Sequence, residues 1–245
     1  MISVRFFGDV LYEETQLFVT PSAASAYAFG SEHFDATDPE RYDINRAGRL
    51  FQKARKLDPH YPNLNHQLAR IAFLRGHFDT ALAYIDVELS ENPSPSPSSY
   101  YVRGLIKGYM GKYESAAKDY SIYLQHDPTN WAAANDLAWV LLKADRPQDA
   151  LTAIDKILPG WPDNPWLLNS KATALFELGN LPEALSAAEA ATRSVASVTP
   201  QEWSHAYPGN DPLIATQGLE AFQKAVFENM HTISIALERK QSGVR

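Results

Sequence analysis

The residues that could bind a metal ion or transfer protons are scattered along the chain. No two of the seven histidines are four residues apart, the spacing that places two ligands on one helical face. Metal sites need clustered ligands, so we expect no metal site and surface or capping roles for these histidines. Cysteine is absent, which excludes disulfides, thiolate ligands and cysteine nucleophiles. The histidines are His33, His60, His66, His77, His126, His205 and His231.

Motifs for other catalytic chemistry are also missing from the sequence. Gly104, Gly108 and Gly111 do not have the spacing of a phosphate-binding loop, and there is no Gly-x-Ser-x-Gly nucleophile motif. The adjacent carboxylates of Glu13 and Glu14 have no recognisable acid, base or oxyanion partner nearby in the sequence. We therefore expect no catalytic residue, no cofactor and no enzymatic activity.

Composition places the chain among soluble globular proteins. It has 245 residues, 45 % hydrophobic and 21 % charged, with a formal net charge of −7. This acidic balance argues against a nucleic-acid partner, which needs a basic face. No apolar run is long enough to span a membrane, and Asp9 interrupts any signal-peptide core at the start. The sequence leaves two interpretations open, a complete product or a chain that follows a leader or membrane anchor.

Small residues recur along the chain with a period of about 34. Five alanines are separated by 34, 35, 34 and 34 residues, at Ala47, Ala81, Ala116, Ala150 and Ala184. Twelve residues after the first four come Pro59, Pro93, Pro128 and Pro162. Twelve residues before the last four come Ala69, Gly104, Ala138 and Ala172.

Each recurring position has a physical role in a pair of helices. Small residues allow two helices to approach closely. Gly76, Gly111 and Gly179, five residues before their alanines, supply the positive φ of a helix C-terminus. Proline ends the second helix because it lacks an amide donor and restricts the preceding residue. The pattern predicts repeated units of helix, tight turn, helix and proline stop.

This pattern resembles the tetratricopeptide repeat, with matching segments Pro62–Pro95, Pro97–Asn130, Trp131–Asn164 and Pro165–Val198. The resemblance implies an all-α fold, a right-handed α-α superhelix of about five helix pairs. We expect one solenoid domain over residues 1–245. It would comprise an irregular N-terminal part (1–61), a four-repeat core (62–198), and a degenerate repeat with a capping helix (199–245).

The two ends depart from the repeat. Thr199 to Glu202 reads as a capping box, and Asp211-Pro212 as the start of a long helix. That helix carries apolar residues at steps of three and four: Leu219, Phe222, Val226, Met230, Ile233 and Leu237. It either covers the last repeat or meets a partner or a second copy. At the other end we expect helices near 3–18, 22–34 and 44–57.

Charge is uneven in the N-terminal part. Residues 41–57 carry six bases and one acid, whereas residues 1–40 carry seven acids and one base. The two stretches are either solvated faces that pair with each other, or the bases form a docking strip for an acidic partner or a lipid headgroup.

The resemblance also implies a concave groove lined by the first helix of each repeat. The candidate ligand-binding residues in that groove are His66, Arg70, Phe73, Tyr101, Leu105, Tyr109, Asn135, Trp139, Asn169, Thr173 and Phe176. They are aromatic and apolar with few charges. Asn135 and Asn169 lie one period apart, and a carboxamide can pair with a peptide backbone. Alternatively, both asparagines support adjacent helices, and terminal helices cover the aromatic side chains.

The favoured function is a non-catalytic scaffold or adaptor that binds a peptide or helical segment of another protein in this groove. The lysines of the carboxylate clamp found in some relatives are missing, which disfavours that binding mode. The alternatives are an envelope-associated assembly factor of the pilus, secretion or outer-membrane type, and an enzyme subunit or a carbohydrate-binding protein. The sequence does not fix the location; it favours the cytoplasm, and we expect a monomer. Dimerisation through the C-terminal helix, and a periplasmic or membrane-anchored location set by an upstream leader, are the alternatives.

Overall fold

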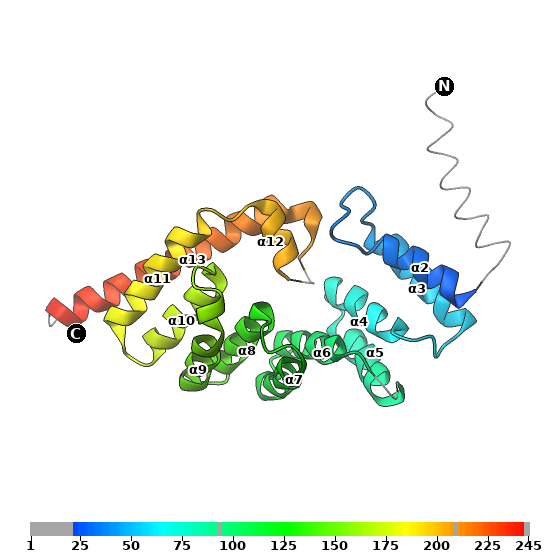
Figure 1. The fold of residues 1–245 in the computed structure, drawn as a ribbon, viewed down its shortest axis with the longest axis horizontal. Helices are drawn as coiled ribbons and strands as arrows, with labels where there is room; N and C mark the ends of the chain where they lie inside the picture. Colours follow the sequence, from blue (N-terminus) through cyan, green and yellow to red (C-terminus); the bar gives the residue numbers. More distant parts are fainter. Residues whose placement is uncertain (1–21, 93–94, 208–209, 243–245) are drawn as a thin grey trace, which may run out of the picture. The chain divides into compact units, whose positions relative to one another are not determined.

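Helices form at the positions that the repeat predicts. The computed structural model describes residues 22–92, 95–207 and 210–242, and all regular structure there is helical (Figure 1). The elements of the first half are α2 (Ala23–Glu32), α3 (Ile44–Leu57), α4 (Leu64–Leu74), α5 (Phe78–Glu91), α6 (Pro97–Tyr109) and α7 (Tyr113–His126). Those of the second half are α8 (Trp131–Lys143), α9 (Pro147–Ile157), η1 (Leu158–Gly160), α10 (Pro165–Glu177), α11 (Leu181–Val195), α12 (Pro200–Ala206), η2 (Pro212–Ile214) and α13 (Ala215–Ser242).

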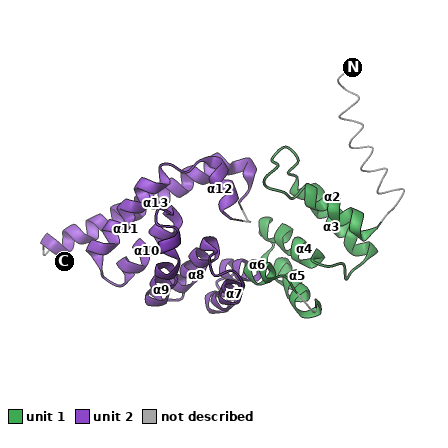
Figure 2. Ribbon diagram, viewed as in Figure 1, with its two compact units in different colours: residues 1–102 green, residues 103–245 purple. Residues whose placement is uncertain are grey.

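The helices group into two compact units. Unit 1 comprises residues 1–102 and unit 2 residues 103–245, with the boundary inside α6 (Figure 2). Each unit has apolar side chains buried between its own helices. The expectation of a single solenoid domain with the boundaries given above stays a prediction.

The core of unit 1 lies between α2, α3 and α4. Phe51 is fully buried, and its ring lies 5.5 Å from that of Tyr27 and 6.3 Å from that of Phe34. A Cβ at Gly30 would lie 2.7 Å from the Phe51 ring, so glycine is what allows α2 to approach α3. Asp43 caps α3 by accepting hydrogen bonds from the backbone of Asn45 and Arg46.

The turns inside the helix pairs use the left-handed backbone conformation. Gly76, Gly111 and Gly179 have φ of +72°, +74° and +79°, as the sequence predicts. The pair α8–α9 has no glycine there. Asp145 takes the same conformation at φ 58°, which a short polar side chain tolerates better than most.

In unit 2, each helix from α7 to α11 packs on the next, and α13 lies along α11 (Figure 1). Leu219, Val226 and Ile233, spaced by seven residues, are the buried positions of α13. Met230 and Phe222 pack beside them against the core formed by α10 and α11. The apolar stripe of the C-terminal helix therefore covers the last repeat, as a capping helix does.

A buried ion cluster joins α6 to α7 within unit 2. The Asp119 side chain is 3 % exposed, and its two oxygens accept hydrogen bonds from Arg103 Nη2 at 2.7 Å and Nε at 2.9 Å. Lys107 Nζ donates to the same carboxylate at 2.7 Å. One carboxylate therefore holds two cations at the interface of two helices.

Most expected elements are confirmed. The helix over 44–57 has those bounds, and the helix near 22–34 covers Ala23–Glu32 behind the N-cap Ser22. Thr199 and Glu202 form the capping box, and Asp211 caps a short 3-10 turn that leads into α13. The helix expected near 3–18 lies outside the described residues. The all-α fold of stacked helix pairs is confirmed.

A search of the described ranges finds no helix that is both long and apolar enough to cross a bilayer.

Candidate functional site

The candidate groove residues of unit 2 lie on the first helices of their repeats. Asparagine N-caps fix where α8 and α10 begin: Asn130 Oδ1 accepts from the backbone of Ala133 at 3.0 Å, and Asn164 Oδ1 from that of Leu167 at 3.1 Å. Both helices therefore start at the same point of the repeat. They present Asn135 and Asn169 at equivalent positions of neighbouring helices.

Asn135 is buried and bonded to two side chains. Its Nδ2 donates to the hydroxyl of Tyr207 at 2.8 Å, and its Oδ1 accepts from Ser170 Oγ at 2.7 Å. Burial and the nearby carboxylate of Asp136 raise the pKa of Tyr207 well above its usual range, which keeps the hydroxyl neutral. Tyr207 follows α12, so this contact fastens the C-terminal part of the chain to α8.

Asn169 binds a different residue of the C-terminal part. Asn229 Nδ2 on α13 donates to Asn169 Oδ1 at 2.9 Å and to Thr173 Oγ1 at 3.2 Å. The two periodic asparagines therefore each hold a polar side chain of the same chain. A carboxamide has both donors and an acceptor, which is what allows Asn135 to bind Ser170 as well as the arriving Tyr207.

Aromatic rings make the same connection beside the asparagines. Trp166 on α10 stacks on Phe222 of α13, with ring centroids 4.7 Å apart and planes 8° apart. Trp131 lies 5.1 Å from Trp166, and both rings meet Tyr207 edge-on at 5.6 and 6.3 Å. We call the described residues 207 and 210–229 the C-terminal arm. Its side chains occupy the first-helix surface of the last two repeats.

Another part of this surface carries the exposed side chain of Tyr109 beside two half-buried aromatic rings. Tyr109 is 60 % exposed, and its ring lies 5.8 Å from that of Trp139. The Tyr113 ring lies 6.2 Å from that of Trp139, edge to face. A Cβ at Gly108 would lie 2.8 Å from the Trp139 ring, so the glycine makes room for the indole. Trp139 is therefore held in a defined position by three residues around it.

The remaining candidates of unit 2 are partly covered. Leu105 is half-buried on α6, and Phe176 is half-buried against the core of α10, α11 and α13. The structure therefore brings together Asn135, Asn169 and Thr173 under the C-terminal arm. It places Tyr109 beside Trp139.

The other four candidates lie in unit 1. Tyr101 is 5 % exposed, whereas Arg70 and Phe73 are half-buried. The Arg70 guanidinium lies 4.4 Å from the centre of the Phe34 ring, and its Nη1 donates to Gln67 Oε1 at 3.0 Å.

His66 is a buried histidine bonded inside unit 1. Its ring Nδ1 lies 3.0 Å from Ser99 Oγ, and its backbone amide donates to Glu88 Oε2 at 3.3 Å. Burial, with a smaller effect of Arg70, lowers its pKa from 6.5 to about 4. His66 therefore stays neutral in the folded chain at neutral pH.

This lowered pKa predicts an acid-sensitive unit 1. The unfolded chain binds more protons at His66 between pH 6.5 and about 4, so stability falls as the pH falls through that range. The loss is on the order of 3 kcal/mol across the whole range. Urea unfolding at a series of pH values should show this slope, and His66→Gln should remove it. His60→Gln, at a largely exposed histidine, should leave the slope unchanged.

The sequence pattern did not identify the partners of the two asparagines. Tyr207 lies 72 residues after Asn135, and Asn229 lies 60 residues after Asn169. Neither occupies a recurring position of the repeat. The apolar periodicity of α13 was the available signal, and it points to coverage of the last repeat without naming the polar contacts.

The described residues contain no cluster of three or more His, Asp or Glu side chains arranged to hold a metal ion. The groups that the site presents are carboxamides, which form hydrogen bonds, and aromatic faces.

Comparison with known proteins agrees with the repeat pattern. Two family models described as tetratricopeptide repeat match residues 101–165 and 165–190. The TPR repeat-containing protein YvcD of Bacillus subtilis (strain 168) is 27 % identical over 165 residues, which cover 66 % of this chain and 32 % of that protein. The chain thus spans about a third of the length of that curated relative.

Solved structures of MamA are similar in fold. One crystal structure of MamA has a TM-score of 0.55 and 20 % identity, covering 63 % of this chain and 90 % of that one. A MamA structure labelled AMB-1 has a TM-score of 0.59 and 16 % identity, covering 72 % of this chain and 93 % of that one. At these identities the likeness shows the fold alone.

Proposed function

We propose that this chain, a tetratricopeptide-repeat protein, is a non-catalytic scaffold whose concave surface in unit 2 binds a peptide or helical segment of another protein. The fold itself supports a protein-interaction scaffold in general terms, because stacked helix pairs offer an extended binding surface. The finer proposal assigns the binding to the first helices α6, α8 and α10.

The observation that carries the proposal is that this surface already holds a polypeptide segment, the C-terminal arm. Asn135 and Asn169 bind side chains of the arm, and Trp166 stacks on its Phe222. A surface that binds one stretch of chain through carboxamides and aromatic rings has the chemistry to bind another. The arm therefore indicates which kind of ligand this surface accepts.

The anchors that we assign to the partner are Tyr109 and Trp139. Large aromatic side chains dominate interface energetics because they bury much area with few rotatable bonds. The Trp139 ring contacts Tyr113 and fits into the space that Gly108 leaves. Little side-chain entropy is therefore lost when a partner covers it. The surface has few charges, which favours a segment with apolar or aromatic residues.

The same proposal assigns a capping role to α13 and keeps the chain a monomer. The apolar residues of α13 that a dimer would use, Leu219, Val226 and Ile233, are buried within unit 2.

Peptide selection tests the proposal. Peptides selected from a random display library on the full chain should be rich in apolar and aromatic residues. The double variant Tyr109→Ser/Trp139→Ala should bind them at least about 30-fold more weakly, since loss of one interface hot spot already costs about 2 kcal/mol. Fluorescence anisotropy measures the affinities.

Phe227→Ser is the matched control, because Phe227 is an aromatic residue of α13 that is 56 % exposed. Its affinity for the selected peptides should stay within about twofold of the parent chain. Equal affinities for the double variant and the parent chain would show that the peptides bind elsewhere, and the proposal would be abandoned.

A further inference from the structure

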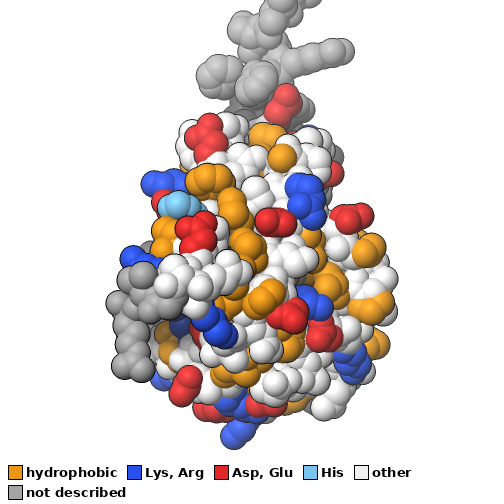
Figure 3. Space-filling model, turned by 90° about the vertical axis from the view of Figure 1, so that its left-hand side faces the viewer, with side chains coloured by type: hydrophobic (Ala, Val, Ile, Leu, Met, Phe, Trp, Pro, Cys, Tyr) orange, Lys and Arg blue, Asp and Glu red, His pale blue; other side chains and the backbone are white. Residues whose placement is uncertain are grey.

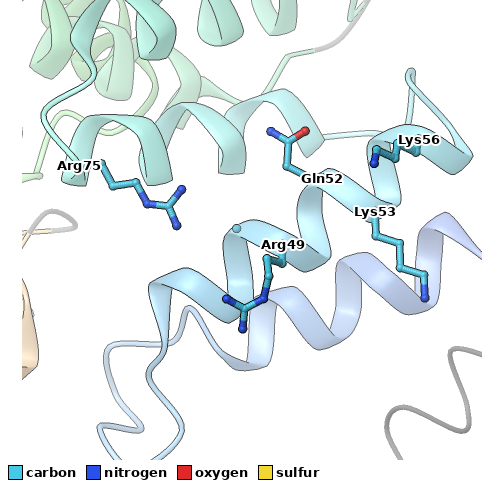
Figure 4. Close-up of a pocket in the computed structure, with 6 residues that line it drawn as sticks. Arg49, Gln52, Lys53, Lys56 and Arg75 are labelled. Atoms are coloured by element: carbon cyan, nitrogen blue, oxygen red, sulfur yellow. The ribbon is translucent and has the colours of Figure 1, made fainter.

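A cationic pocket lies in unit 1, among residues of α3 and the end of α4. It has a volume of about 470 Å³ and is lined by Gly48, Arg49, Gln52, Lys53, Lys56 and Arg75 (Figure 4). Four of these six described residues are basic and none is acidic. Figure 4 shows Arg75 reaching from the end of α4 towards α3.

The basic residues of this region fall into two groups, those that line the pocket and those that do not. Arg55 lies over the Tyr84 ring at 5.0 Å and donates to its hydroxyl at 3.1 Å, so it fastens α3 to α5. Arg41 lies 3.5 Å from a carboxylate oxygen of Glu32 and 3.8 Å from one of Asp38. These two cations serve contacts within unit 1 and do not line the pocket.

Helical spacing places the basic residues of α3 in a row. Arg49, Lys53 and Lys56 are four and three residues apart, which puts them on one face of the helix. Seven residues of helix rise about 10 Å. The row therefore matches a ligand with several negative charges spread over about 10 Å, the length of three residues of extended chain.

Arg75 is held in place before any ligand arrives. Its Nη2 donates to Asn45 Oδ1 at 3.0 Å and to the backbone oxygen of Ile44 at 3.4 Å. A Cβ at Gly48 would lie 3.1 Å from Arg75 Nη2 and 3.3 Å from Ile71 Cγ2. The glycine therefore gives the guanidinium room to lie against α3. A guanidinium has five donors in a planar fork, which suits carboxylates.

We propose that this pocket binds an acidic polypeptide segment of a partner protein, with neighbouring Asp or Glu carboxylates along the row of α3 and at Arg75. The chain as a whole has a net charge of −7, so a local set of four cations is a strong departure from its average. Unlike this pocket, the C-terminal end of unit 2 presents Lys and Arg interspersed with Asp and Glu (Figure 3). The proposal rests on unit 1 alone and is independent of the concave surface of unit 2.

The surroundings favour a polypeptide over a lipid or a single phosphate group. Among the described residues that line the pocket there is no large apolar side chain, whereas membrane-surface binding combines basic with apolar residues. Lys56 and Arg75 lie at the C-terminal ends of α3 and α4, where the backbone offers carbonyl oxygens rather than amide donors. All contacts to an anion therefore come from separate side chains, which suits separate carboxylates.

Fluorescence anisotropy with a labelled peptide of six consecutive glutamates tests the proposal on the full chain. The parent chain should bind this peptide more weakly as salt is added, and a glutamine peptide of the same length should not bind. The double variant Arg49→Glu/Lys56→Glu should bind at least tenfold more weakly. Lys224→Glu/Lys240→Glu changes the net charge equally at exposed positions of α13, and it should stay within twofold of the parent chain.

A positioning variant separates geometry from charge. Gly48→Ala should weaken binding of the glutamate peptide several-fold by displacing Arg75. Thermal unfolding should show no loss of stability in α3, since alanine favours a helix interior. Unchanged binding would contradict the role given to Gly48 and Arg75.

Other outcomes overturn the proposal. Equal affinity of the parent chain and the Arg49→Glu/Lys56→Glu variant would place the binding elsewhere. If phosphatidylserine vesicles or pyrophosphate bind through Arg49 and Lys56 and the glutamate peptide does not, the ligand is a phosphate compound and the polypeptide assignment is wrong.

Discussion

Replacing Asp119 with alanine should lower the free energy of unfolding by about 3–5 kcal/mol, because it leaves two cations at a helix interface without their shared carboxylate. Arg103 and Lys107 both donate to Asp119, whose side chain is 3 % exposed. Water therefore cannot replace the carboxylate fully. Urea unfolding followed by circular dichroism measures the loss.

A surface pair provides the matched control. Asp155 accepts from Lys171 Nζ at 2.7 Å, but its side chain is 48 % exposed. Asp155→Ala should therefore cost no more than about 1 kcal/mol. Similar losses of unfolding free energy for the two variants would show that burial does not decide how much the Asp119 cluster stabilises the chain. Exchanging Arg103, Lys107 and Asp119 together for apolar residues should recover much of the loss.

Replacing Trp166 with alanine should lower stability by about 2–4 kcal/mol, somewhat less than for a fully buried tryptophan. Trp166 is half-buried, and its ring contacts Trp131, Tyr207 and Phe222. The loss should be local, since two of these contacts belong to the C-terminal arm. Hydrogen exchange should therefore accelerate in α12 and α13 and remain slow in α7.

Trp161→Ala is the control for this prediction. Trp161 is 44 % exposed and lies 6.4 Å from Trp131, so its loss should cost less than about 1 kcal/mol. If α13 stays as protected in Trp166→Ala as in the parent chain, the aromatic cluster does not hold the arm. The polar contacts of Asn135 and Asn169 would then have to hold it alone.

The repeat predicts the fold well because its signals are local. Alanine at position 47 and its equivalents, glycine before the second helix and proline after it each act within one helix pair. Asp145 shows that the turn does not depend on glycine alone. It takes the left-handed conformation in the repeat that lacks the glycine, so the turn forms although its signature residue is missing.

The contacts of the candidate groove residues could not be predicted in the same way. Asn135 and Asn169 were identified from their spacing, but their contacts come from Tyr207 and Asn229, which lie far along the chain and outside the repeat. Such contacts depend on where the C-terminal arm packs. The roles of the basic residues of 41–57 could not be predicted either. Only the three-dimensional structure shows that Arg55 contacts Tyr84, whereas other bases of this stretch line the pocket with Arg75.

The central claim is that the concave surface of unit 2 binds a polypeptide segment at Trp139, beside the C-terminal arm. Nitrogen-15 NMR of the five tryptophan indole groups tests it most directly, with the Trp139 signal assigned from a Trp139→Phe variant. Titration with a selected peptide should shift the Trp139 indole signal most strongly, in step with the anisotropy curve. A saturating titration that shifts other indole signals and leaves that of Trp139 in place would contradict the claim.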